Sequence, residues 1–552
     1  MTLICCPIEV AAPDQSVRPI ETALADARAA RESGADLVEW RIDPFMLGIE
    51  GESERRYRLH SAAALLTESA LPCILTARPS AEGGAFEGED EDRLLFLEEL
   101  IETAGQPPRY LDIELATYDA HAENRGRIEA LAGPDRATSL ILSLHDFEGV
   151  PPDLNRRMLR AFEADACSVM KIAVRARSLR DNLDLFDLLM QAPKPTIALG
   201  MGEFGLMSRV LAPKFGGFLT FASLRAATVT APGQPTIREL LETYRFRSIG
   251  KATRVYGVIG WPVAQSKGPL IHNAGFAEVG HDGVYLPLPV AADAADIEGS
   301  RASLKATVDA LMAHERLGFG GASVTSPHKE AMRGLGIEHG WQREPLVDRV
   351  GAANTLACGR GATSLANTDV EGLIGPLEAH LGQLSARRIG IVGAGGVARA
   401  AAFGLAERGA TVILYNRTRA RADELAREIS TTLERAGVSE GRVVSAPIEN
   451  LPKACCEAFI NATPLGMAGG PDPEAVAMPI GEMKNLGKAT VFFDTVYNPL
   501  ETPLLRAARD LGYQAIDGAR MFTRQAARQF SLWTGSDAPS ELFDRVARAS
   551  GT

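Results

Sequence analysis

The stretch ACSVMKIAV, residues 166–174, places Lys171 in the middle of a short apolar segment. Apolar and β-branched residues fall on both faces of this segment, which predicts a strand that is buried on both sides. An ammonium group in such a strand carries a large desolvation cost unless a partner compensates it. Lys171 therefore either pairs with a buried carboxylate or serves as a reactive group inside the fold.

The same alternation of strand and helix continues through the first half of the chain. Eight apolar segments alternate with amphipathic helical stretches: LICCPI, DLVEWRID, CILTARP, YLDIELA, SLILSLHDF, SVMKIAV, TIALGM and FLTFASL. A doubly wound sheet is the alternative arrangement, but it rarely needs so many units in so short a chain. Eight such units in about 245 residues match the size of a (β/α)8 barrel, and we predict that fold.

Charged residues stand at or near the ends of five consecutive predicted strands; they are Glu39, Arg41, Arg78, Glu114, His145 and Lys171. Active sites of (β/α)8 barrels form at the carboxyl ends of the strands. A desolvated lysine there can form a Schiff base with a ketone, and a nearby histidine can act as a general base. Arg41, Arg78 and Arg209 suit a carboxylate or polyol substrate, because guanidinium groups bind paired oxygens.

The first half resembles the type I 3-dehydroquinate dehydratases in the order and spacing of seven motifs: EWRID, TARP…GG, DIEL, SLHDF, MKIAV, MGEFGLMSR and APGQ. The resemblance implies that Lys171 forms an imine with the substrate ketone, that His145 moves the neighbouring proton, and that Glu114 supports His145. It also implies a set of substrate-binding residues: Glu39, Arg41 and Arg78 for the ring hydroxyls, Arg209 and Gln234 for the carboxylate and closing loop, and Thr230, which keeps a hydroxyl that serine supplies in many relatives.

A glycine-rich turn marks a second α/β unit at residues 389–418, IGIVGAGGVARAAAFGLAERGATVILYNRT. The turn of Gly393, Ala394, Gly395 and Gly396 lies between a predicted strand and helix, as in Rossmann domains that bind a dinucleotide pyrophosphate. The next strand ends in Asn416, Arg417 and Thr418, with Arg421 one turn later. Because basic residues replace the acidic residue that binds the NAD ribose, we predict NADP as the cofactor.

The second half resembles the shikimate dehydrogenases in seven motifs: GVIGWPVAQSKGPLIHN, GASVTSPHKE, GAANTL, NTDVEG, NATPLGM, FDTVYNPLETPLL and DGARMFTRQAARQF. The resemblance implies that Lys329 and Asp369 form the acid/base pair for hydride transfer to or from NADP. The implied binding residues are Ser266 for the substrate carboxylate, Thr325, Asn354, Tyr497 and Gln525 for the ring hydroxyls or carboxylate, and Thr463 and Gly518 beside the nicotinamide.

One position departs from the shikimate dehydrogenase pattern. The family usually has Ser-x-Ser in the carboxylate-binding turn, whereas this chain has Ser266-Lys267-Gly268. The missing hydroxyl is expected to leave room beside C1 of the substrate, which either admits quinate or is filled by a water molecule. We therefore expect a bifunctional enzyme that converts 3-dehydroquinate to shikimate, with a quinate or dual quinate/shikimate dehydrogenase as the alternative. A scaffold without activity is disfavoured because Lys171, His145, Lys329 and Asp369 are all present.

The polar stretch GKAT at residues 250–253 separates the two halves. We predict a dehydratase barrel at 1–248, an α/β substrate-binding domain at 254–380, and a Rossmann NADP-binding domain with C-terminal helices at 381–552.

Composition limits the partners and the compartment. The net charge of −12 argues against nucleic acid or an anionic membrane as a partner, so small-molecule substrates are expected. Seven cysteines and nine histidines show no ligand spacing, which favours a reduced, cytoplasmic protein without a metal. The chain enters the strand-like TLICCPIEV at once, and no apolar run approaches the roughly 20 residues of a spanning helix, so we expect neither a targeting peptide nor a membrane span.

Overall fold

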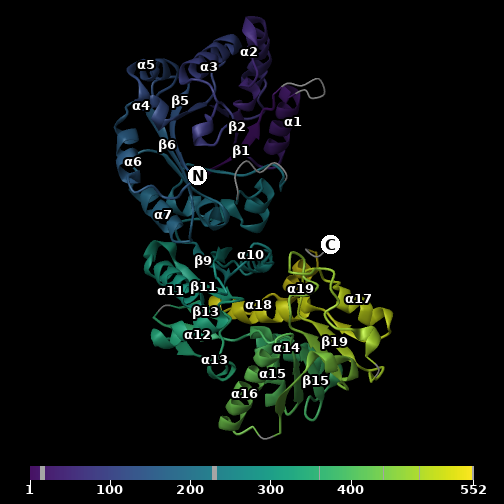
Figure 1. Ribbon diagram of the computed structural model, residues 1–552. Coiled ribbons are helices and arrows are strands. Elements are labelled where there is room, and N and C mark those ends of the chain that lie inside the picture. Colours follow the sequence, from purple (N-terminus) through teal and green to yellow (C-terminus); the bar gives the residue numbers. More distant parts are fainter. Residues whose placement is uncertain (13–18, 227–232, 360, 439, 484, 550–552) are drawn as a thin grey trace. The chain divides into compact units, whose positions relative to one another are not determined.

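The computed structural model describes residues 1–12, 19–226, 233–359, 361–438, 440–483 and 485–549. Contacts divide the chain into two compact units, Met1–Thr253 and Arg254–Thr552. The first unit contains one eight-stranded sheet, and the second contains two six-stranded sheets (Figure 1). None of the helices in the described ranges is long and apolar enough to cross a membrane.

The sheet of the first unit is a barrel of eight parallel strands: β1 Leu3–Glu9, β2 Leu37–Arg41, β3 Cys73–Thr76, β4 Tyr110–Glu114, β5 Ser139–Asp146, β6 Cys167–Arg175, β7 Thr196–Met201 and β8 Leu219–Phe221. The hydrogen-bonded order runs from β7 down to β1 and then to β8. The amide of Phe218 donates to the carbonyl of Thr196 at 2.8 Å, which joins β8 to β7 and nearly closes the sheet. The predicted (β/α)8 barrel is confirmed.

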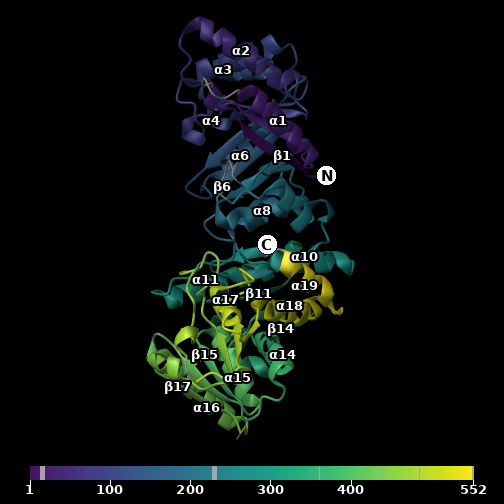
Figure 2. The same cartoon turned by 90° about the vertical axis from the view of Figure 1, so that its right-hand side faces the viewer.

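Helices surround this barrel (Figures 1 and 2). They are α1 Pro19–Glu32, α2 Gly51–Thr67, α3 Asp90–Ala104, α4 Leu115–Ala120, α5 Ala122–Leu131, α6 Leu154–Glu163, α7 Asp181–Gln191, α8 Leu206–Val210 and α9 Ala212–Phe215. Each long helix buries one face; in α3 that face carries Leu94, Leu97 and Leu100, which have no exposed surface. The strands are therefore covered on their outer side, which explains why their sequences are apolar on both faces.

The barrel interior changes from apolar to polar along the strands. Five neighbouring strands contribute Leu37, Ile74, Tyr110, Ile141 and Val169 to one apolar cluster. Two residues further along the same strands stand Glu39, Thr76, Asp112, Ser143 and Lys171, all buried. Because side chains two apart on a strand share a face, these polar groups form the next layer of the interior, toward the carboxyl ends.

The second unit begins with a mixed sheet in the order β10-β9-β11-β13-β14-β12. Its strands are β9 Arg254–Gly260, β10 Gly283–Pro289, β11 Phe319–Val324, β12 Gln342–Arg343, β13 Thr355–Cys358 and β14 Thr363–Ala366. The helices of this segment are α10 Gly268–Glu278, α11 Ile297–Ala313, α12 Lys329–Glu338 and α13 Pro345–Val350. Strand β13 runs antiparallel to both of its neighbours, and β10, β9 and β11 are parallel.

The other sheet of this unit is a parallel Rossmann sheet in the order β17-β16-β15-β18-β19-β20. Its strands are β15 Arg388–Val392, β16 Thr411–Tyr415, β17 Arg442–Ala446, β18 Ala458–Asn461, β19 Val491–Asp494 and β20 Gln514–Ile516. The accompanying helices are α14 Asp369–Leu381, α15 Gly396–Glu407, α16 Arg419–Arg435, α17 Pro503–Asp510, α18 Gly518–Thr534 and α19 Ser540–Ala549. The strand order reverses between β15 and β18, and such a switch point is where open α/β sheets bind ligands.

Helix α18 joins the two sheets of the second unit. Its Met521 belongs to the core of the Rossmann sheet, whereas Phe530 and Trp533 belong to the core beside the mixed sheet. The indole of Trp533 donates to the carbonyl of Leu356 on β13 at 2.9 Å. The last part of the chain therefore packs against strands from both segments.

Candidate active sites

Lys171 on β6 is buried and paired with carboxylates. Its Nζ donates to Asp112 Oδ2 at 2.7 Å and to Glu39 Oε1 at 3.3 Å. The ammonium also lies 4.7 Å from the centre of the Phe221 ring. The ion pair considered for Lys171 is therefore present, and the same carboxylates hold the Nζ in a fixed position in the polar layer of the barrel.

Asp112 also belongs to this site, although it was not among the residues predicted from the sequence. Besides Lys171, it binds Arg78 Nη2 at 2.9 Å. Burial by itself raises the pKa of a carboxyl group, but Arg78 and Lys171 outweigh it and hold the pKa of Asp112 well below its usual range. Its position in the motif DIEL, two residues before Glu114 on the same strand face, is the signal that could have identified it.

Glu114 does not support His145, contrary to the expectation. Its Oε1 accepts from Arg78 and its Oε2 from Arg93, each at 2.6 Å. The carboxylate beside His145 is Glu82, whose Oε2 lies 2.9 Å from His145 Nδ1 and 3.1 Å from the His145 amide nitrogen. Glu82 comes from the turn after β3, immediately before Gly83 and Gly84, so the quoted motif TARP…GG spans it.

The His145–Glu82 pair has unusual acidity. Burial, together with the negative charge of Glu114, raises the pKa of Glu82 to about 7. Burial and then the positive charges of Arg78 and Lys171 hold the pKa of His145 well below its usual value. His145 is therefore a neutral imidazole near pH 7, and an ionised Glu82 would keep the proton on Nδ1 and leave Nε2 free to accept another.

The arginines of this site have different environments. Arg78 also donates to Ser143 Oγ at 2.7 Å, so its guanidinium is occupied by protein groups. Arg41 pairs with Asp43 through two contacts of 2.9 Å. Arg209 on α8 is buried, and burial lowers its pKa to about 10. Within the described ranges its Nε has no hydrogen-bond partner and its side chain forms no ion pair, as expected of a cation that awaits an anionic ligand.

Gln234 and Thr230 are the other two residues predicted to bind the first substrate. Gln234 is buried near the carboxyl end of the barrel. Thr230 lies outside the described residues.

In the second unit, Lys329 and Asp369 stand at the first positions of α12 and α14. Lys329 Nζ lies 2.5 Å from Asp369 Oδ2. Asn354 donates from Nδ2 to Asp369 Oδ1 at 2.9 Å and to Thr368 Oγ1 at the same distance. Both amide protons of Asn354 are thus used, one on Asp369 and one on Thr368, rather than being free for a ring hydroxyl.

The glycine turn lies beside this pair. A Cβ atom on Gly396 would be 3.3 Å from Lys329 Cδ, so the lysine side chain lies next to the turn. Gly393 has φ 123°, and a Cβ there would be 2.7 Å from the carbonyl oxygen of Ala462. A Cβ on Gly395 would meet no atom within 4 Å, so the turn keeps an open side on which a pyrophosphate fits.

The loop after β18 approaches the same turn. Thr463 donates from Oγ1 to Asn461 Oδ1 at 2.6 Å, and Asn461 Nδ2 donates to Asp494 at 2.9 Å. Gly518 begins α18, where a Cβ would lie 2.3 Å from the carbonyl oxygen of Val496. Thr463 and Gly518 thus both lie at the carboxyl ends of the parallel strands, where Thr463 is held by its hydrogen bond and Gly518 leaves no room for a side chain.

Basic residues follow β16 as predicted from the sequence. Arg417, Thr418 and Arg421 are exposed. Arg419 lies between them but is engaged, since its Nε lies 2.7 Å from Asp423 Oδ1. In the described part of the chain, the side chains of Arg417 and Arg421 form no ion pair, and Asn416 Nδ2 donates to the Thr418 carbonyl at 2.9 Å.

The place of a Cβ on Gly268 is not empty. A Cβ on Gly268 would lie 2.8 Å from Tyr285 Cε1 and 3.2 Å from Tyr285 Oη, so the tyrosine ring already fills it. Ser266 Oγ accepts from the Gly268 amide at 3.2 Å and shares a hydrogen bond with Tyr497. The sequence alone does not indicate that Tyr285 lies against Gly268, because the two residues are 17 positions apart and belong to different elements.

The other two residues predicted to bind the second substrate lie on separate elements. Thr325 follows β11, where its amide donates to the Ile259 carbonyl at 2.8 Å. Gln525 lies on α18, and its Oε1 is buried without a hydrogen-bond partner among the described residues. A free buried acceptor of this kind fits a ligand hydroxyl.

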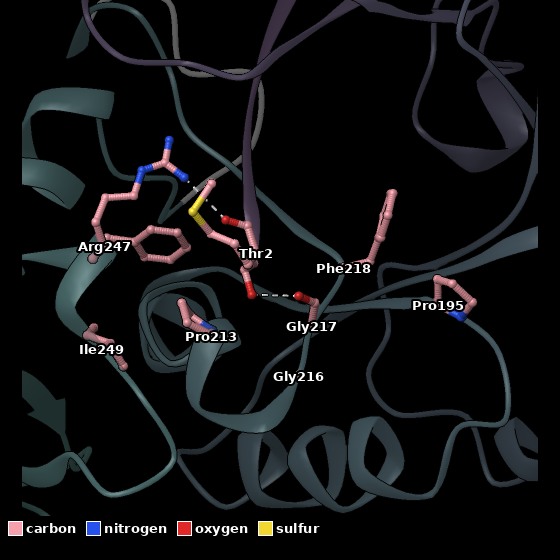
Figure 3. A pocket seen from close by; sticks show the side chains of 10 residues that line it. Thr2, Pro195, Pro213, Gly216, Gly217, Phe218, Arg247 and Ile249 are labelled. Carbon is pink, nitrogen blue, oxygen red and sulfur yellow. Dashed lines mark hydrogen bonds between the residues drawn. The ribbon is translucent and has the colours of Figure 1, made fainter.

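A cavity of about 410 Å³ lies at the opposite end of the barrel from Lys171, near the starts of β1, β7 and β8. Figure 3 shows the Thr2 hydroxyl donating to the Gly217 carbonyl, at 2.7 Å, and Arg247 beside them. Apolar side chains and backbone atoms form most of its lining, which consists of Met1, Thr2, Pro195, Pro213, Gly216, Gly217, Phe218, Phe246, Arg247 and Ile249. None of the predicted site residues lines it.

Family models of known proteins match successive parts of the chain. Family models match residues 16–251 as type I 3-dehydroquinase, 258–356 as the shikimate dehydrogenase substrate binding domain, 377–440 as shikimate/quinate 5-dehydrogenase and 518–548 as the shikimate 5'-dehydrogenase C-terminal domain.

Similar proteins include full-length and partial relatives. The chloroplastic bifunctional 3-dehydroquinate dehydratase/shikimate dehydrogenase of Arabidopsis thaliana is 35% identical over 99% of this chain and 84% of its own length. The NADP(+) shikimate dehydrogenase of Methanosarcina mazei is 38% identical over 53% of this chain and 97% of its own length. A crystal structure of a shikimate dehydrogenase with NADP+ is 32% identical, covers 54% of this chain and 96% of its own, and has a TM-score of 0.46. This chain therefore belongs to the family of bifunctional shikimate-pathway enzymes that combine a type I 3-dehydroquinate dehydratase with a shikimate dehydrogenase.

Proposed function

We propose that the first unit dehydrates 3-dehydroquinate through an imine on Lys171, and that the second unit reduces the resulting 3-dehydroshikimate to shikimate with NADPH. The observation that carries the first step is the position of Lys171 Nζ, 2.7 Å from Asp112 in the polar layer of the barrel, with His145 on the neighbouring strand. A lysine held in this way, with a neutral imidazole beside it, has the two groups that imine-assisted proton removal requires.

The dehydration proceeds in four steps: imine formation, proton removal, loss of the C1 hydroxyl and hydrolysis of the imine. Nζ attacks the ketone carbon, the two protons that the nitrogen loses pass to the ketone oxygen, and that oxygen leaves as water to give an iminium ion. His145 Nε2 then removes a proton from the adjacent carbon, whose electron pair moves toward the iminium nitrogen. The C1 hydroxyl takes the proton back from His145 and departs as water, and hydrolysis of the imine releases the product and Lys171. The sum is the loss of one water molecule.

Glu82 and the arginines have distinct parts in this proposal. Ionised Glu82 keeps the proton on His145 Nδ1 and stabilises the imidazolium that forms during proton transfer. Arg209, whose Nε lacks a partner among the described residues, binds the substrate carboxylate. Arg78 orients Asp112 and Glu114 rather than the substrate, because protein groups already occupy its guanidinium.

In the second unit, the turn from Gly393 to Gly396 holds the pyrophosphate of NADP, and Arg417 and Arg421 hold its 2′-phosphate. Two features support this assignment: neither arginine forms an ion pair within the described residues, and no acidic residue ends β16. NADPH supplies the hydride when it is bound. The chain's own contribution is the ammonium of Lys329, which donates a proton to the carbonyl oxygen, and Asp369, which holds that ammonium.

The test uses the whole protein. Incubation with 3-dehydroquinate and sodium borohydride, followed by peptide mass spectrometry, should add the reduced ligand to the Lys171 peptide alone. A Lys171→Gln variant is the control, and it should lose dehydratase activity while still oxidising shikimate with NADP+. An unmodified Lys171 peptide from active wild-type protein would contradict the imine. For the second unit, 3-dehydroshikimate and NADPH should yield shikimate by chromatography, and Lys329→Met should abolish this step only.

A further inference from the structure

Tyr285 on β10 lies against the place where the Cβ of a second serine would stand in the Ser266-Lys267-Gly268 turn. Its Cε1 and Oη lie 2.8 and 3.2 Å from the place of a Cβ on Gly268. Ser266 Oγ lies 3.2 Å from the same place. The tyrosine ring edge and the serine hydroxyl therefore face the same small volume at the start of α10.

The ring of Tyr285 is held on several sides. Its hydroxyl donates to Ser323 Oγ at 2.7 Å, and Ser323 in turn donates to Gln529 Oε1 at 2.9 Å. Gln529 is fixed because its Nε2 donates to the Asn354 carbonyl at 3.2 Å. The ring face stacks on His272, with centroids 4.5 Å apart and planes 28° apart. A small ligand group cannot push this ring aside without breaking these contacts.

The hydroxyl of Tyr285 also has no proton to offer to a ligand. A phenol carries one donor, and that donor is used by Ser323, whose own proton is used by Gln529. The atom of Tyr285 nearest to the Gly268 position is Cε1 of the aromatic edge, at 2.8 Å. A ligand hydroxyl placed there would lie closer to that carbon than van der Waals contact allows, so the exclusion is steric, although Tyr285 Oη and Ser266 Oγ keep lone pairs that can accept.

We propose that Tyr285 is a specificity-determining residue of the dehydrogenase site, whose ring excludes ring acids that carry a hydroxyl group on C1. The proposal rests on the function proposed above and on the role that the family resemblance implies for Ser266, which is to bind the substrate carboxylate. That carboxylate is attached to C1, so any other substituent of C1 lies within about two bonds of it. Shikimate has a trigonal C1 without a hydroxyl, whereas quinate has a tetrahedral C1 that carries one. Gly268 is therefore the position that accommodates Tyr285, and it does not admit quinate.

The experiment measures kcat/KM for the oxidation of shikimate and of quinate by the intact protein with NADP+. Wild type should prefer shikimate by roughly 100-fold, as expected when the wall of a pocket excludes an added hydroxyl. Tyr285→Leu, which removes the ring edge, should narrow this ratio at least tenfold. Tyr285→Phe keeps the edge and is the matched control, so its ratio should stay within about threefold of wild type.

The results separate a failure of this inference from a failure of the proposed function. Equal use of both substrates by wild type overturns the inference and leaves the proposed function intact, whereas no oxidation of shikimate by wild type defeats the proposed function itself. A Tyr285→Leu variant that oxidises shikimate with an unchanged ratio also overturns the inference. If that variant does not fold, inhibition of the wild-type enzyme by quinate tests the inference instead. Quinate should fail to inhibit shikimate oxidation at concentrations at which shikimate saturates the enzyme. Inhibition by quinate as strong as the binding of shikimate would contradict the proposal.

Discussion

Glu82 Oε2 lies 2.9 Å from His145 Nδ1, although the two residues are 63 positions apart. The carboxylate reaches the histidine because the turn after β3 folds back over the end of β5. Gly83 has φ 79°, and a Cβ on Gly84 would lie 2.0 Å from the Arg78 carbonyl oxygen, so this turn needs both glycines. The pair resembles the base and its orienting carboxylate in other enzymes that use a histidine.

Replacement of Glu82 by Gln should therefore impair the dehydratase selectively. The amide still accepts from Nδ1, but it lacks the charge that stabilises an imidazolium. We expect kcat for dehydration to fall roughly 100-fold, within the usual range for general acid–base contributions. Shikimate oxidation, measured on the same sample, is the internal control and should not change. A dehydratase rate within threefold of wild type would exclude a role for Glu82 in orienting His145.

Glu114→Gln should have a different effect, since Glu114 bridges Arg78 and Arg93 instead of contacting His145. Removal of one charge leaves two buried guanidinium groups without a full partner, which typically costs about 3–5 kcal/mol. We expect a lower thermal midpoint for the barrel, monitored by circular dichroism. A variant with wild-type stability and a lost pH dependence of dehydration would instead restore the support of His145 that the sequence suggested.

The pH dependence of dehydration follows from the same pair. Because burial raises the pKa of Glu82 to about 7, wild-type kcat/KM should rise with pH through an acid limb near that value. Glu82→Gln should lack this limb. Stability should respond in the opposite direction, since the folded protein holds the Glu82 proton more tightly than the unfolded chain. The contribution of Glu82 is fully present below about pH 4.5 and is lost as pH rises through about 7.

Urea unfolding at pH 5 and pH 8 checks this sign. The free energy of unfolding of wild type relative to Glu82→Gln should be lower at pH 8 than at pH 5. A difference that grows with pH would mean that the carboxyl group titrates below its usual range, contrary to its burial.

Much of the fold could be predicted from the sequence because barrel interiors repeat every second residue. The alternation that places Tyr110, Asp112 and Glu114 on one face of β4 is visible in the motif YLDIE. The contact of Glu82 with His145 could not be predicted in the same way, because it depends on the path of a turn. The partner of Glu114 was also uncertain, since an inward side chain can reach neighbours on either side.

Gly268 shows a second limit of sequence reasoning. A glycine in place of serine indicates missing atoms, but it does not say which distant side chain fills their place. Here an aromatic residue of β10 does so, and the ring is positioned by a hydrogen bond to β11. The packing of Tyr285 against the start of α10 therefore determines what fills this place, and the local motif alone does not indicate it.

The arginines after β16 give a test of cofactor choice. We expect Arg417→Ala combined with Arg421→Ala to raise KM for NADP+ roughly 10- to 100-fold. Both arginines are exposed, so each contact to a phosphate should contribute about 0.7–1.4 kcal/mol, less than the about 1.5–3 kcal/mol of a hydrogen bond to a charged group. Use of NAD+ should change little. Arg419→Ala is the matched control, since Arg419 already pairs with Asp423, and its KM should stay within about threefold. Equal losses with NADP+ and NAD+ would argue against binding of the 2′-phosphate.

Gly268 and Tyr285 should be energetically coupled. In Gly268→Ala, the new Cβ would lie 2.8 Å from Tyr285 Cε1, and overpacking of this kind costs about 1–3 kcal/mol. In a Tyr285→Leu background the same change should cost less, because the ring edge is gone, so a double-mutant cycle from urea unfolding should give a coupling energy of about 0.5–3 kcal/mol. Gly334→Ala on α12, where a Cβ would meet no atom within 4 Å, is the control and should be neutral or slightly stabilising in both backgrounds. Additive effects of Gly268→Ala and Tyr285→Leu would show that the ring can retreat from the turn, and a ring that retreats could not serve as a wall against a C1 hydroxyl.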